Sequence, residues 1–400
     1  MPKNSFFWAS SGLLLLTLFE LARVYFIMPF PGSQLDDAAN LSRVGMAYWL
    51  YQSAPWLRTM GLLLLLVPFF MVLTKPTKPW YRWLAGGLAV VYGGVLYLVN
   101  YEMMADHMFR QPTTKRMLPL SQNKIPANKL VLGVVEKGEA RAYPIQLIGY
   151  HHQVRDTVDG KPMLITYCTV CRTGRVYEPV VAGKPETFRL VGMDHFNAMF
   201  EDETTGSWWR QATGEAIMGP RRGQTLVGIT ARQMTLAEWA AEYPNTLVMQ
   251  PDPAFRAETD SLGRYDLGVG RGKLTRRDSA SWQPKSWVVG VALTGASKAF
   301  DWNALLKNHV VNDHVGGQPI VLTLAPDGQT FRVFSRNAGK KQLTFSPHQG
   351  GQLTDRETGS VWSRTGRSTS GTLAGQQLTP MQAQQEFWHS WKTFHPQTTR

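Results

Sequence analysis

Residues 133–160 (GVVEKGEARAYPIQLIGYHHQVRDTVDG) and residues 290–317 (GVALTGASKAFDWNALLKNHVVNDHVGG) align with each other without a gap. Self-similarity at a fixed offset is the signature of a duplicated structural unit. We therefore predict two tandem copies of one domain, at about 125–250 and 287–400, the second of them degenerate. The match runs on to Tyr177 and Phe334 and later pairs Thr205–Ser207 with Thr358–Ser360, Trp209 with Trp362, Trp239 with Trp391, and Pro244 with Pro396.

Within each copy the pattern favours strands over helices. Short runs rich in β-branched and aromatic residues, bounded by Gly, Pro or Asp, are typical of strands. One helix is predicted near the end of each copy, at 235–243 and 380–394. The soluble module is thus predicted to be mainly β, of the α+β class, and residues 251–286, rich in Gly, Arg, Asp and Ser, are predicted to link the copies. The predicted strands of the first copy are 129–135, 140–144, 163–168 and 175–181.

The first part of the chain, residues 1–104, is predicted to be a three-helix transmembrane anchor. A membrane-spanning helix needs about 20 mostly apolar residues. The first span is broken only by Glu20 and Arg23, which stand three residues apart and are expected to pair on one helix face. The second span is short and contains Pro68. The three predicted spans are about 6–28, 57–73 and 80–101.

The basic residues of the short loops predict the orientation of the anchor. Lys75, Lys78 and Arg82 lie between the second and third spans, whereas Asp36 and Asp37 lie between the first and second. Cytoplasmic loops carry an excess of Lys and Arg. We therefore predict a protein of the bacterial inner (cytoplasmic) membrane, with a cytoplasmic N-terminus and the bulk of the chain in the periplasm. The first segment has no small-x-small cleavage site and is interpreted as a retained anchor.

The chain carries a formal net charge of +13. Residues 1–100 hold seven basic and three acidic side chains, so the remaining 300 residues carry +9. The favoured interpretation is a solvated surface, with anionic lipid headgroups as the alternative contact. Nucleic acid is not an expected partner, because no recognisable binding motif accompanies the charge. The predicted partners are the lipid bilayer and an unidentified periplasmic ligand or protein.

The only two cysteines, Cys168 and Cys171, form a Cys-x-x-Cys motif whose counterparts in the second copy are Ala325 and Gly328. Residues that are present in only one copy are the candidates for a functional rather than a scaffold role. Three hypotheses stay open: a metal site, a redox-active thiol pair and an inert disulfide. A thioredoxin-type pair needs a helix after the motif, but a strand-like run follows here. The favoured geometry is therefore a hairpin turn that points both sulfurs the same way.

A tetrahedral metal site needs two further ligands. The candidates for these ligands are Met193, Asp194 and His195. Two thiolates together with His and Met would suit copper or zinc. Methionine is more often a core filler than a ligand, and His195 has a counterpart in His348, which weakens both assignments. Around this set we expect a pocket lined by Asn197, Arg210 and Gln211.

Two segments, Tyr167–Tyr177 and Asp202–Gly219, resemble a prokaryotic domain-of-unknown-function family, number 3179. The resemblance covers about residues 130–250, with the second copy as a degenerate relative. Members commonly have Pro after the first Cys, where this chain has Thr169. The resemblance implies that the cysteines and the Asp202–Gly219 segment form one site, but it implies no activity. The matching positions are Cys168, Cys171, Asp202, Ser207, Trp209, Gln211, Gly214 and Gly219.

Two functions follow as hypotheses. The first is a membrane-anchored periplasmic protein with a thiol-based metal or redox site, in which Cys168 and Cys171 are the primary groups. The second is a non-catalytic envelope binding or assembly module that uses a Trp-rich groove around Trp208 and Trp209, with the cysteines as a structural disulfide. No other catalytic signature occurs in the chain. The sequence alone therefore does not decide between an enzyme and a binding module.

Overall fold

The computed structural model describes residues 2–27, 37–76, 78–270 and 272–400. Met28, the predicted end of the first span, and Asp36 of the first loop lie outside the described residues. The chain divides into two compact units. The first unit comprises residues 1–110, 188–209 and 216–222, and the second comprises residues 111–187, 210–215 and 223–400.

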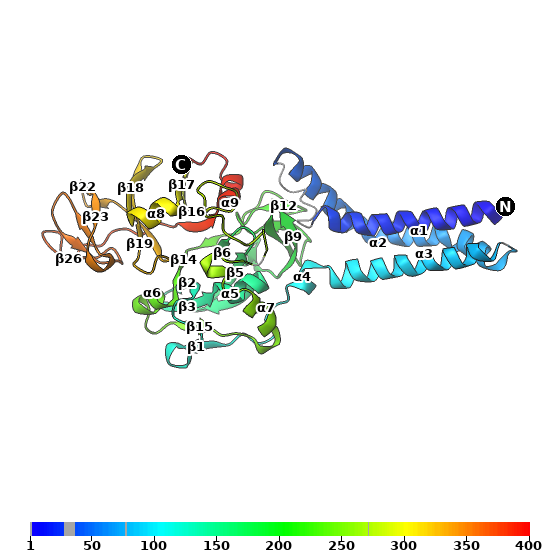
Figure 1. Ribbon diagram of the computed structural model, residues 1–400, viewed down its shortest axis with the longest axis horizontal. Helices are drawn as coiled ribbons and strands as arrows, with labels where there is room; N and C mark the ends of the chain where they lie inside the picture. The colour runs from blue at the N-terminus through cyan, green and yellow to red at the C-terminus, as the bar shows by residue number, and fades with distance from the viewer. Residues whose placement is uncertain (1, 28–36, 77, 271) are drawn as a thin grey trace. The chain divides into compact units, whose positions relative to one another are not determined.

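Three long helices dominate the first unit and lie side by side (Figure 1). All three are long and apolar enough to cross a membrane, which indicates a membrane anchor of the predicted kind. The second helix is much longer than the predicted span 57–73 and runs through both Pro55 and Pro68. Proline is tolerated there because neighbouring helices and local adjustments satisfy the freed backbone groups. The helices are α1 (Pro2–Tyr25), α2 (Asp37–Thr74), α3 (Pro79–Tyr97), the π-helical turn η1 (Leu98–Glu102) and α4 (Ala105–Met108).

A buried carboxylate ties the three helices together. Arg23 donates to Glu20 at 2.9 Å, as the spacing of the two residues predicted. Arg58 of α2 donates to both oxygens of Glu20, at 2.5 and 2.8 Å, and Asn100 joins the same network. The intrahelical pair was visible in the sequence, whereas the partner on α2 was not, because 38 residues separate it from Glu20.

The first unit also contains a four-stranded antiparallel sheet that packs against α2. Trp208 is buried and meets the rings of Tyr48 and Tyr51, with centroid distances of 5.1 and 5.9 Å. Arg189 donates to Glu201 within the sheet at 2.6 Å and also to the Tyr51 hydroxyl. A segment distant in sequence therefore belongs to the anchor's own compact unit. The strand order is β12 (Ala216–Met218), β11 (Trp208–Arg210), β10 (Asn197–Asp202), β9 (Phe188–Asp194).

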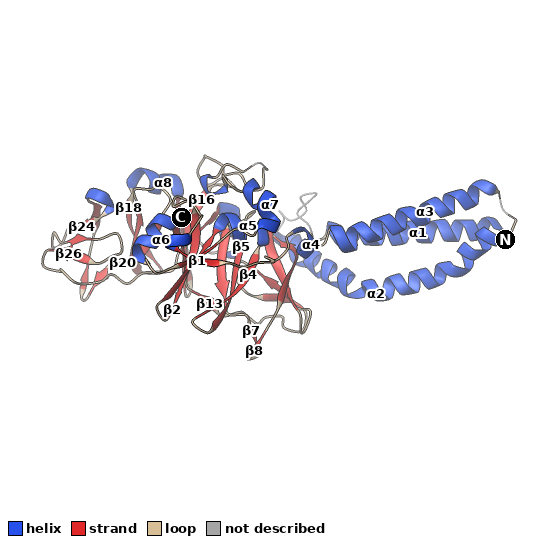
Figure 2. Ribbon diagram, turned by 90° about the horizontal axis from the view of Figure 1, so that it is seen from below, coloured by secondary structure: helices blue, strands red, loops and turns tan. Residues whose placement is uncertain are grey.

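The second unit is mainly β, as predicted, with short helices between small sheets (Figure 2). The first sheets have the orders β1-β15-β3-β2-β14 and β13-β6-β5-β4. Their strands are β1 (Met117–Pro119), β2 (Leu130–Glu136), β3 (Glu139–Pro144), β4 (Gln153–Val158), β5 (Lys161–Cys168), β6 (Thr173–Tyr177), β13 (Gly228–Ile229), β14 (Ala231–Thr235) and β15 (Leu247–Met249), and a separate ribbon joins β7 (Val180–Val181) to β8 (Lys184–Pro185).

The later part of the second unit contains further small sheets. Its sheets have the orders β17-β16-β27, β18-β19-β20, β21-β22 and β23-β24-β25-β26. The strands are β16 (Trp287–Leu293), β17 (Ala296–Asp301), β18 (Val310–Val315), β19 (Gln318–Leu324), β20 (Phe331–Ser335), β21 (Asn337–Ala338), β22 (Lys341–Gln342), β23 (Phe345–Pro347), β24 (Leu353–Asp355), β25 (Val361–Trp362), β26 (Ser368–Ser370) and β27 (Gln384–Phe387).

The helices of the second unit are short. The predicted helix 235–243 is α6, but the predicted helix 380–394 begins too early, because Gln384–Phe387 pairs with β16 as β27. The predicted linker 251–286 contains α7, and its Tyr265 is buried in the core beside Tyr167. The helices are α5 (Ile145–His151), α6 (Leu236–Glu242), α7 (Arg256–Ser261), α8 (Trp302–Asn308) and α9 (Trp388–Phe394), with 3₁₀ turns at Leu120–Gln122, Pro253–Phe255, Tyr265–Leu267 and Gln349–Gly351.

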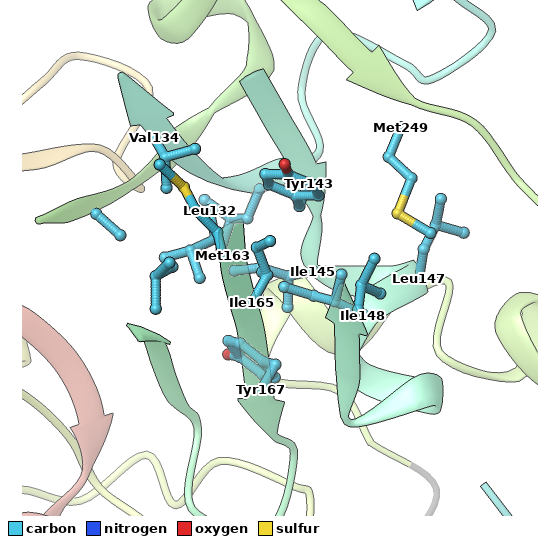
Figure 3. Packing of buried hydrophobic residues seen from close by; sticks show 14 of the residues in the cluster. Leu132, Val134, Tyr143, Ile145, Leu147, Ile148, Met163, Ile165, Tyr167 and Met249 are labelled. Atoms are coloured by element: carbon cyan, nitrogen blue, oxygen red, sulfur yellow. The ribbon is translucent and has the colours of Figure 1, made fainter. Parts of the chain in front are cut away.

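One hydrophobic core supports the strands that carry the cysteines. Side chains from β2, β3, α5 and β5 pack together, and Tyr167 extends this cluster to the residue before Cys168 (Figure 3). Burial of such side chains contributes about 1.5–3 kcal/mol each. The position of the motif is therefore set by a rigid element. The labelled cluster members are Leu132, Val134, Tyr143, Ile145, Leu147, Ile148, Met163, Ile165, Tyr167 and Met249.

Local structures recur at positions that the alignment pairs. His152 and His309 both end a short helix in the left-handed conformation, each with φ 59° and ψ −28°. A Cβ on Gly133 would meet Trp239 at 2.3 Å, and one on Gly290 would meet Trp391 at 2.2 Å. Each indole in turn donates to a threonine hydroxyl seven residues later, at 2.8 Å.

Candidate functional site

The Cys-x-x-Cys motif occupies the turn of a β-hairpin in the second unit. Strand β5 ends at Cys168, which pairs with Thr173 at the start of β6. Arg172 takes a positive φ of 56°, a left-handed conformation that reverses the chain. A strand follows the motif, so the predicted hairpin geometry is confirmed and the helix of a thioredoxin-type site is not found there.

Both cysteines are fully buried thiols rather than a disulfide. The Cys171 thiol hydrogen bonds to Cys168 and to Ser390. Burial raises the pKa of Cys171 well above its ordinary value, and the bond to Cys168 raises it further, against the nearby charge of Lys285. A buried thiol of raised pKa is protonated and unreactive until a base removes its proton.

Lys285 lies beside this hairpin and comes from the predicted linker. Its ammonium group donates to the backbone carbonyl of Val170, between the two cysteines, at 2.5 Å. Burial lowers the pKa of Lys285 to about 8, although the two cysteines act to raise it. A lysine with a pKa near ambient pH exchanges a proton readily, because its charged and neutral forms are both populated.

His389 of α9 is the third group at the turn. Its Nε2 lies 3.1 Å from Lys285 Nζ and 3.2 Å from the carbonyl oxygen of Val170. Burial lowers the pKa of His389 to about 3, and the neighbouring Lys285 lowers it as well, so the imidazole is neutral. Nε2 either accepts from Lys285 or donates to Val170, and each proton arrangement excludes the other.

Strand β27 and helix α9 cover the thiols. The Phe387 amide donates to the Cys171 carbonyl at 3.0 Å, which joins β27 to the turn. Ser390 lies 3.2 Å from the hydroxyl of Thr173 and donates to Glu386 at 2.8 Å. Glu386 in turn pairs with Arg175 of β6. An extended run of the C-terminal region thus closes over a hairpin more than 200 residues earlier.

Arg172 anchors the far side of the turn. It is fully buried, its guanidinium stacks on the ring of Trp287 at 3.9 Å, and its Nε donates to Gln385 at 2.8 Å. Gln233 donates to the same Gln385 oxygen at 2.8 Å. These two glutamines occupy equivalent positions in the alignment and meet directly.

Of the predicted pocket residues, Gln211 lies against this hairpin. Its amide donates to the hydroxyl of Thr166 on β5 at 2.9 Å and to the carbonyl of Thr173 on β6 at 3.0 Å. Arg210 pairs with Glu215 at 3.3 Å and stacks on Phe394 of α9 at 5.3 Å. Gln211 therefore braces the two strands that carry the motif.

Asp202, Ser207 and Trp209 form a turn network in the first unit. Asp202 accepts from the amide of Thr205 at 2.5 Å and from the Trp209 indole at 2.7 Å, and Ser207 accepts from the Arg221 amide at 3.0 Å. The same bonds recur around Asp355, which accepts from the Trp362 indole at 2.8 Å. Recurrence of the network at both places favours a structural role for all three residues.

The other predicted ligands lie on the β9–β10 hairpin of the first unit. His195 Nδ1 is 2.7 Å from the Asp194 carboxylate, and Asn197 pairs with Asp194 across the hairpin. The Met193 amide donates to the Ile27 carbonyl. Within the described ranges 2–27, 37–76, 78–270 and 272–400, no three His, Cys, Asp or Glu side chains gather in a group that could hold a metal ion. Joint metal binding with the cysteines stays a prediction.

The Trp-rich groove of the alternative hypothesis does not fit the burial of its indoles. Trp208 is 0% exposed and Trp209 is 1% exposed, so neither offers a contact surface. Trp208 packs on α2, and Trp209 is held by Asp202 and by the ring of Phe188.

Lys285, His389 and Ser390 are the site residues that the sequence reasoning missed. The copy comparison contained the signal, since their counterparts are Asn128, Ala237 and Glu238. All three lie more than 110 residues from the cysteines in sequence, so only the fold brings them together.

Comparison with known proteins gives a family and no activity. A family model described as "Protein of unknown function (DUF3179)" matches residues 111–398. The match spans the cysteine hairpin and the segment that covers it, and extends far beyond the 130–250 region that carried the resemblance. No curated protein and no solved structure matches the chain.

Proposed function

The chain belongs to the DUF3179 family of proteins of unknown function, and we propose that it is a membrane-anchored thiol–disulfide redox protein with Cys168 and Cys171 as the redox pair. The observation that carries this proposal is the composition of the buried turn. Two thiols in contact share their surroundings with Lys285, a base of pKa about 8, and with the neutral His389. A structural thiol pair needs neither basic group.

The proposed step is an exchange with a disulfide of a second thiol compound. One cysteine, deprotonated by neutral Lys285, attacks that disulfide, forms a mixed disulfide and releases one thiol. The second cysteine then attacks the mixed disulfide, which leaves a Cys168–Cys171 bond and a second released thiol. Two electrons pass to the substrate, and the two cysteine protons end on the two released thiols. Access to the turn requires β27 and α9 to open.

We also propose that the two copies arose by duplication and that the site is shared between them. The support is a matched set of backbone hydrogen bonds. The amides of Leu236 and Trp388 donate to Lys129 and Ser286, both at 2.8 Å. The amides one residue later, in Ala237 and His389, donate to Ala127 and Pro284 at 2.8 and 3.0 Å. On this proposal the second copy contributes to the site, because it supplies His389 and Ser390, and Lys285 lies two residues before its start.

The location follows the charge of the loops. We propose that the anchor lies in the bacterial inner membrane with Lys75 and Lys78 on the cytoplasmic side and the second unit in the periplasm. An oxidising compartment permits a reversible disulfide. Copper or zinc binding remains the alternative proposal, but the buried ammonium of Lys285 beside the thiols disfavours a second cation there.

The test uses the full chain in detergent micelles, equilibrated in glutathione buffers of graded redox potential. Thiols of the native protein, and of samples quenched in acid and then denatured, are alkylated near neutral pH and counted by mass spectrometry. We expect one two-electron transition, absent in Cys168→Ser and in Cys171→Ser, with no bound metal in either redox state. Thiols that stay reduced across the whole range, and react only after denaturation, would overturn the proposal. A stoichiometric copper or zinc ion lost with either cysteine would replace it by the metal site.

A further inference from the structure

A second candidate site lies in the second unit, away from the thiols. A cavity of about 450 Å³ opens between α6 and β14 on one side and β20 with the segment before β27 on the other. Its volume is within the range of small-molecule sites, about 300–1,000 Å³. One part of its lining, the polar wall, includes Arg232, Glu242 and Tyr243, and another part, the apolar wall, includes Phe331, Val333 and Met381. The cavity is therefore shaped for an amphipathic molecule.

The polar wall carries an excess of positive charge. Arg232 donates to Glu242 at 2.8 Å, and Arg332 donates to Glu242 at 3.0 Å and to Glu238 at 3.1 Å. Glu238 also pairs with Arg364, and both of these residues line a neighbouring hollow rather than this cavity. The cavity itself is lined by two guanidinium groups, Arg232 and Arg332, and by one carboxylate, Glu242. The side chain of Arg332 is only 7% exposed, so this imbalance lies in a poorly solvated place where charge interactions are strong.

The comparison of the two copies singles out these residues. Arg232, Glu238, Glu242 and Tyr243 correspond to Gln384, Ser390, Phe394 and His395. On the equivalent side of the unit, Arg210 stacks on Phe394, and Gln211 bridges the hairpin strands. These charged residues therefore occur at the cavity and not at the aligned positions, just as the cysteines and Lys285 occur only at the thiol site.

We propose that this cavity binds a small organic monoanion with an apolar body, of the class of aryl or short-chain acyl carboxylates. The anionic group faces Arg232 and Arg332, and the apolar body lies against Phe331, Val333 and Met381. The proposal does not depend on thiol chemistry. The cavity does adjoin the thiol hairpin through hydrogen bonds, because Gln233 lines it and shares Gln385 with Arg172.

The test compares three probes that share one apolar body: 4-phenylbutyrate, 4-phenylbutanamide and 4-phenylbutylamine. Binding to the full chain in lipid nanodiscs is measured by saturation-transfer NMR and calorimetry, with empty nanodiscs as the blank. We expect the acid to bind about tenfold more tightly than the amide, and the amine most weakly, since one charge-assisted contact is worth about that factor.

Two variants locate the binding. Met381→Trp fills the apolar wall and should weaken the acid at least tenfold, whereas Ile229→Trp, at the equivalent position of the first copy, should not. Arg232→Gln leaves Glu242 paired with Arg332 and should remove the preference for acid over amide. The proposal is overturned if Met381→Trp and Ile229→Trp bind the acid equally, or if Arg232→Gln keeps the full preference. If Met381→Trp fails to fold, the acid-over-amide preference of Arg232→Gln tests the proposal by itself. Loss of thiol redox activity in Cys168→Ser leaves this result unaffected, so the two proposals fail separately.

Discussion

Two hairpin turns of the second unit, which the sequence alignment pairs, carry different side chains and reverse the chain at different residues, Arg172 in one and Gly328 in the other. The β5–β6 turn carries Cys168 and Cys171 and is faced by Lys285 and His389. The β19–β20 turn carries Ala325 and Gly328, and it is closed instead by Asp327, which accepts from the Thr330 amide and hydroxyl. The second turn closes without sulfur, so the thiols are not required to build the hairpin.

The residues at the positions that face the two turns also differ. Where the thiol turn meets Lys285, His389 and Ser390, the other turn has Asn128, Ala237 and Glu238 at the equivalent positions. A thiol pair kept for stability would not need basic groups on another element. The thiols and the basic groups are present together at one turn and absent together at the other. This is expected if they act as one functional unit.

The largest expected effect is a loss of stability in two matched tryptophan variants, only one of which should also make the thiols more accessible. Trp239→Ala and Trp391→Ala each remove a fully buried indole packed on a glycine and should lower the free energy of unfolding by about 3–5 kcal/mol. Only Trp391→Ala should also speed alkylation of Cys168 and Cys171, because it loosens α9. Chemical denaturation and thiol-trapping rates measure the two effects. Equal trapping rates in both variants would mean that α9 is not the cover of the thiols.

The pH dependence of stability sharpens the role of Lys285. Its folded pKa of about 8 lies below the ordinary value of 10.5, so the unfolded chain binds more protons between those pH values. Stability should therefore rise with pH from about 8 to 10.5, by up to about 3 kcal/mol from this group, and its cost is fully present below pH 8. Lys285→Met should remove that rise relative to the protein that retains Lys285.

The control for this measurement is Lys392→Met, which alters an exposed lysine on helix α9. Unfolding free energies of the three proteins are compared at pH 7, 8, 9 and 10. All three proteins carry the Cys168→Ser and Cys171→Ser changes, because the charge of Lys285 acts on the pKa of Cys171 and the difference would otherwise mix the two groups. Parallel profiles with and without Lys285→Met would refute the buried ammonium.

The smallest expected effect tests what the copies share. Trp209→Phe and Trp362→Phe each leave a buried aspartate, Asp202 or Asp355, without its indole donor. Each should cost about 1–3 kcal/mol, as the loss of a donor to a buried charged acceptor does. The two losses should agree within about 1 kcal/mol if the turns are equivalent scaffold. A much larger loss of redox activity than of stability in Trp209→Phe alone would give this residue a functional role.

Several features were accessible from the sequence because they depend on near neighbours. The apolar runs that became α1 to α3, the Glu20–Arg23 pair and the hairpin around the cysteines are all local patterns. The helix predicted at 380–394 failed in its first part for a long-range reason. Gln384–Phe387 is a strand because β16, about 97 residues earlier, offers it an edge.

What the sequence by itself determined is the composition of each half of the site: a Cys-x-x-Cys turn absent from the second copy, and a lysine and histidine absent from the first. Only the tertiary structure decided that these halves meet. Lys285 and His389 reach the Val170 carbonyl across 115 and 219 residues. Burial then sets the proton affinity of Lys285 and Cys171, because the cost of a charge depends on what surrounds it in space and not on its neighbours in the chain.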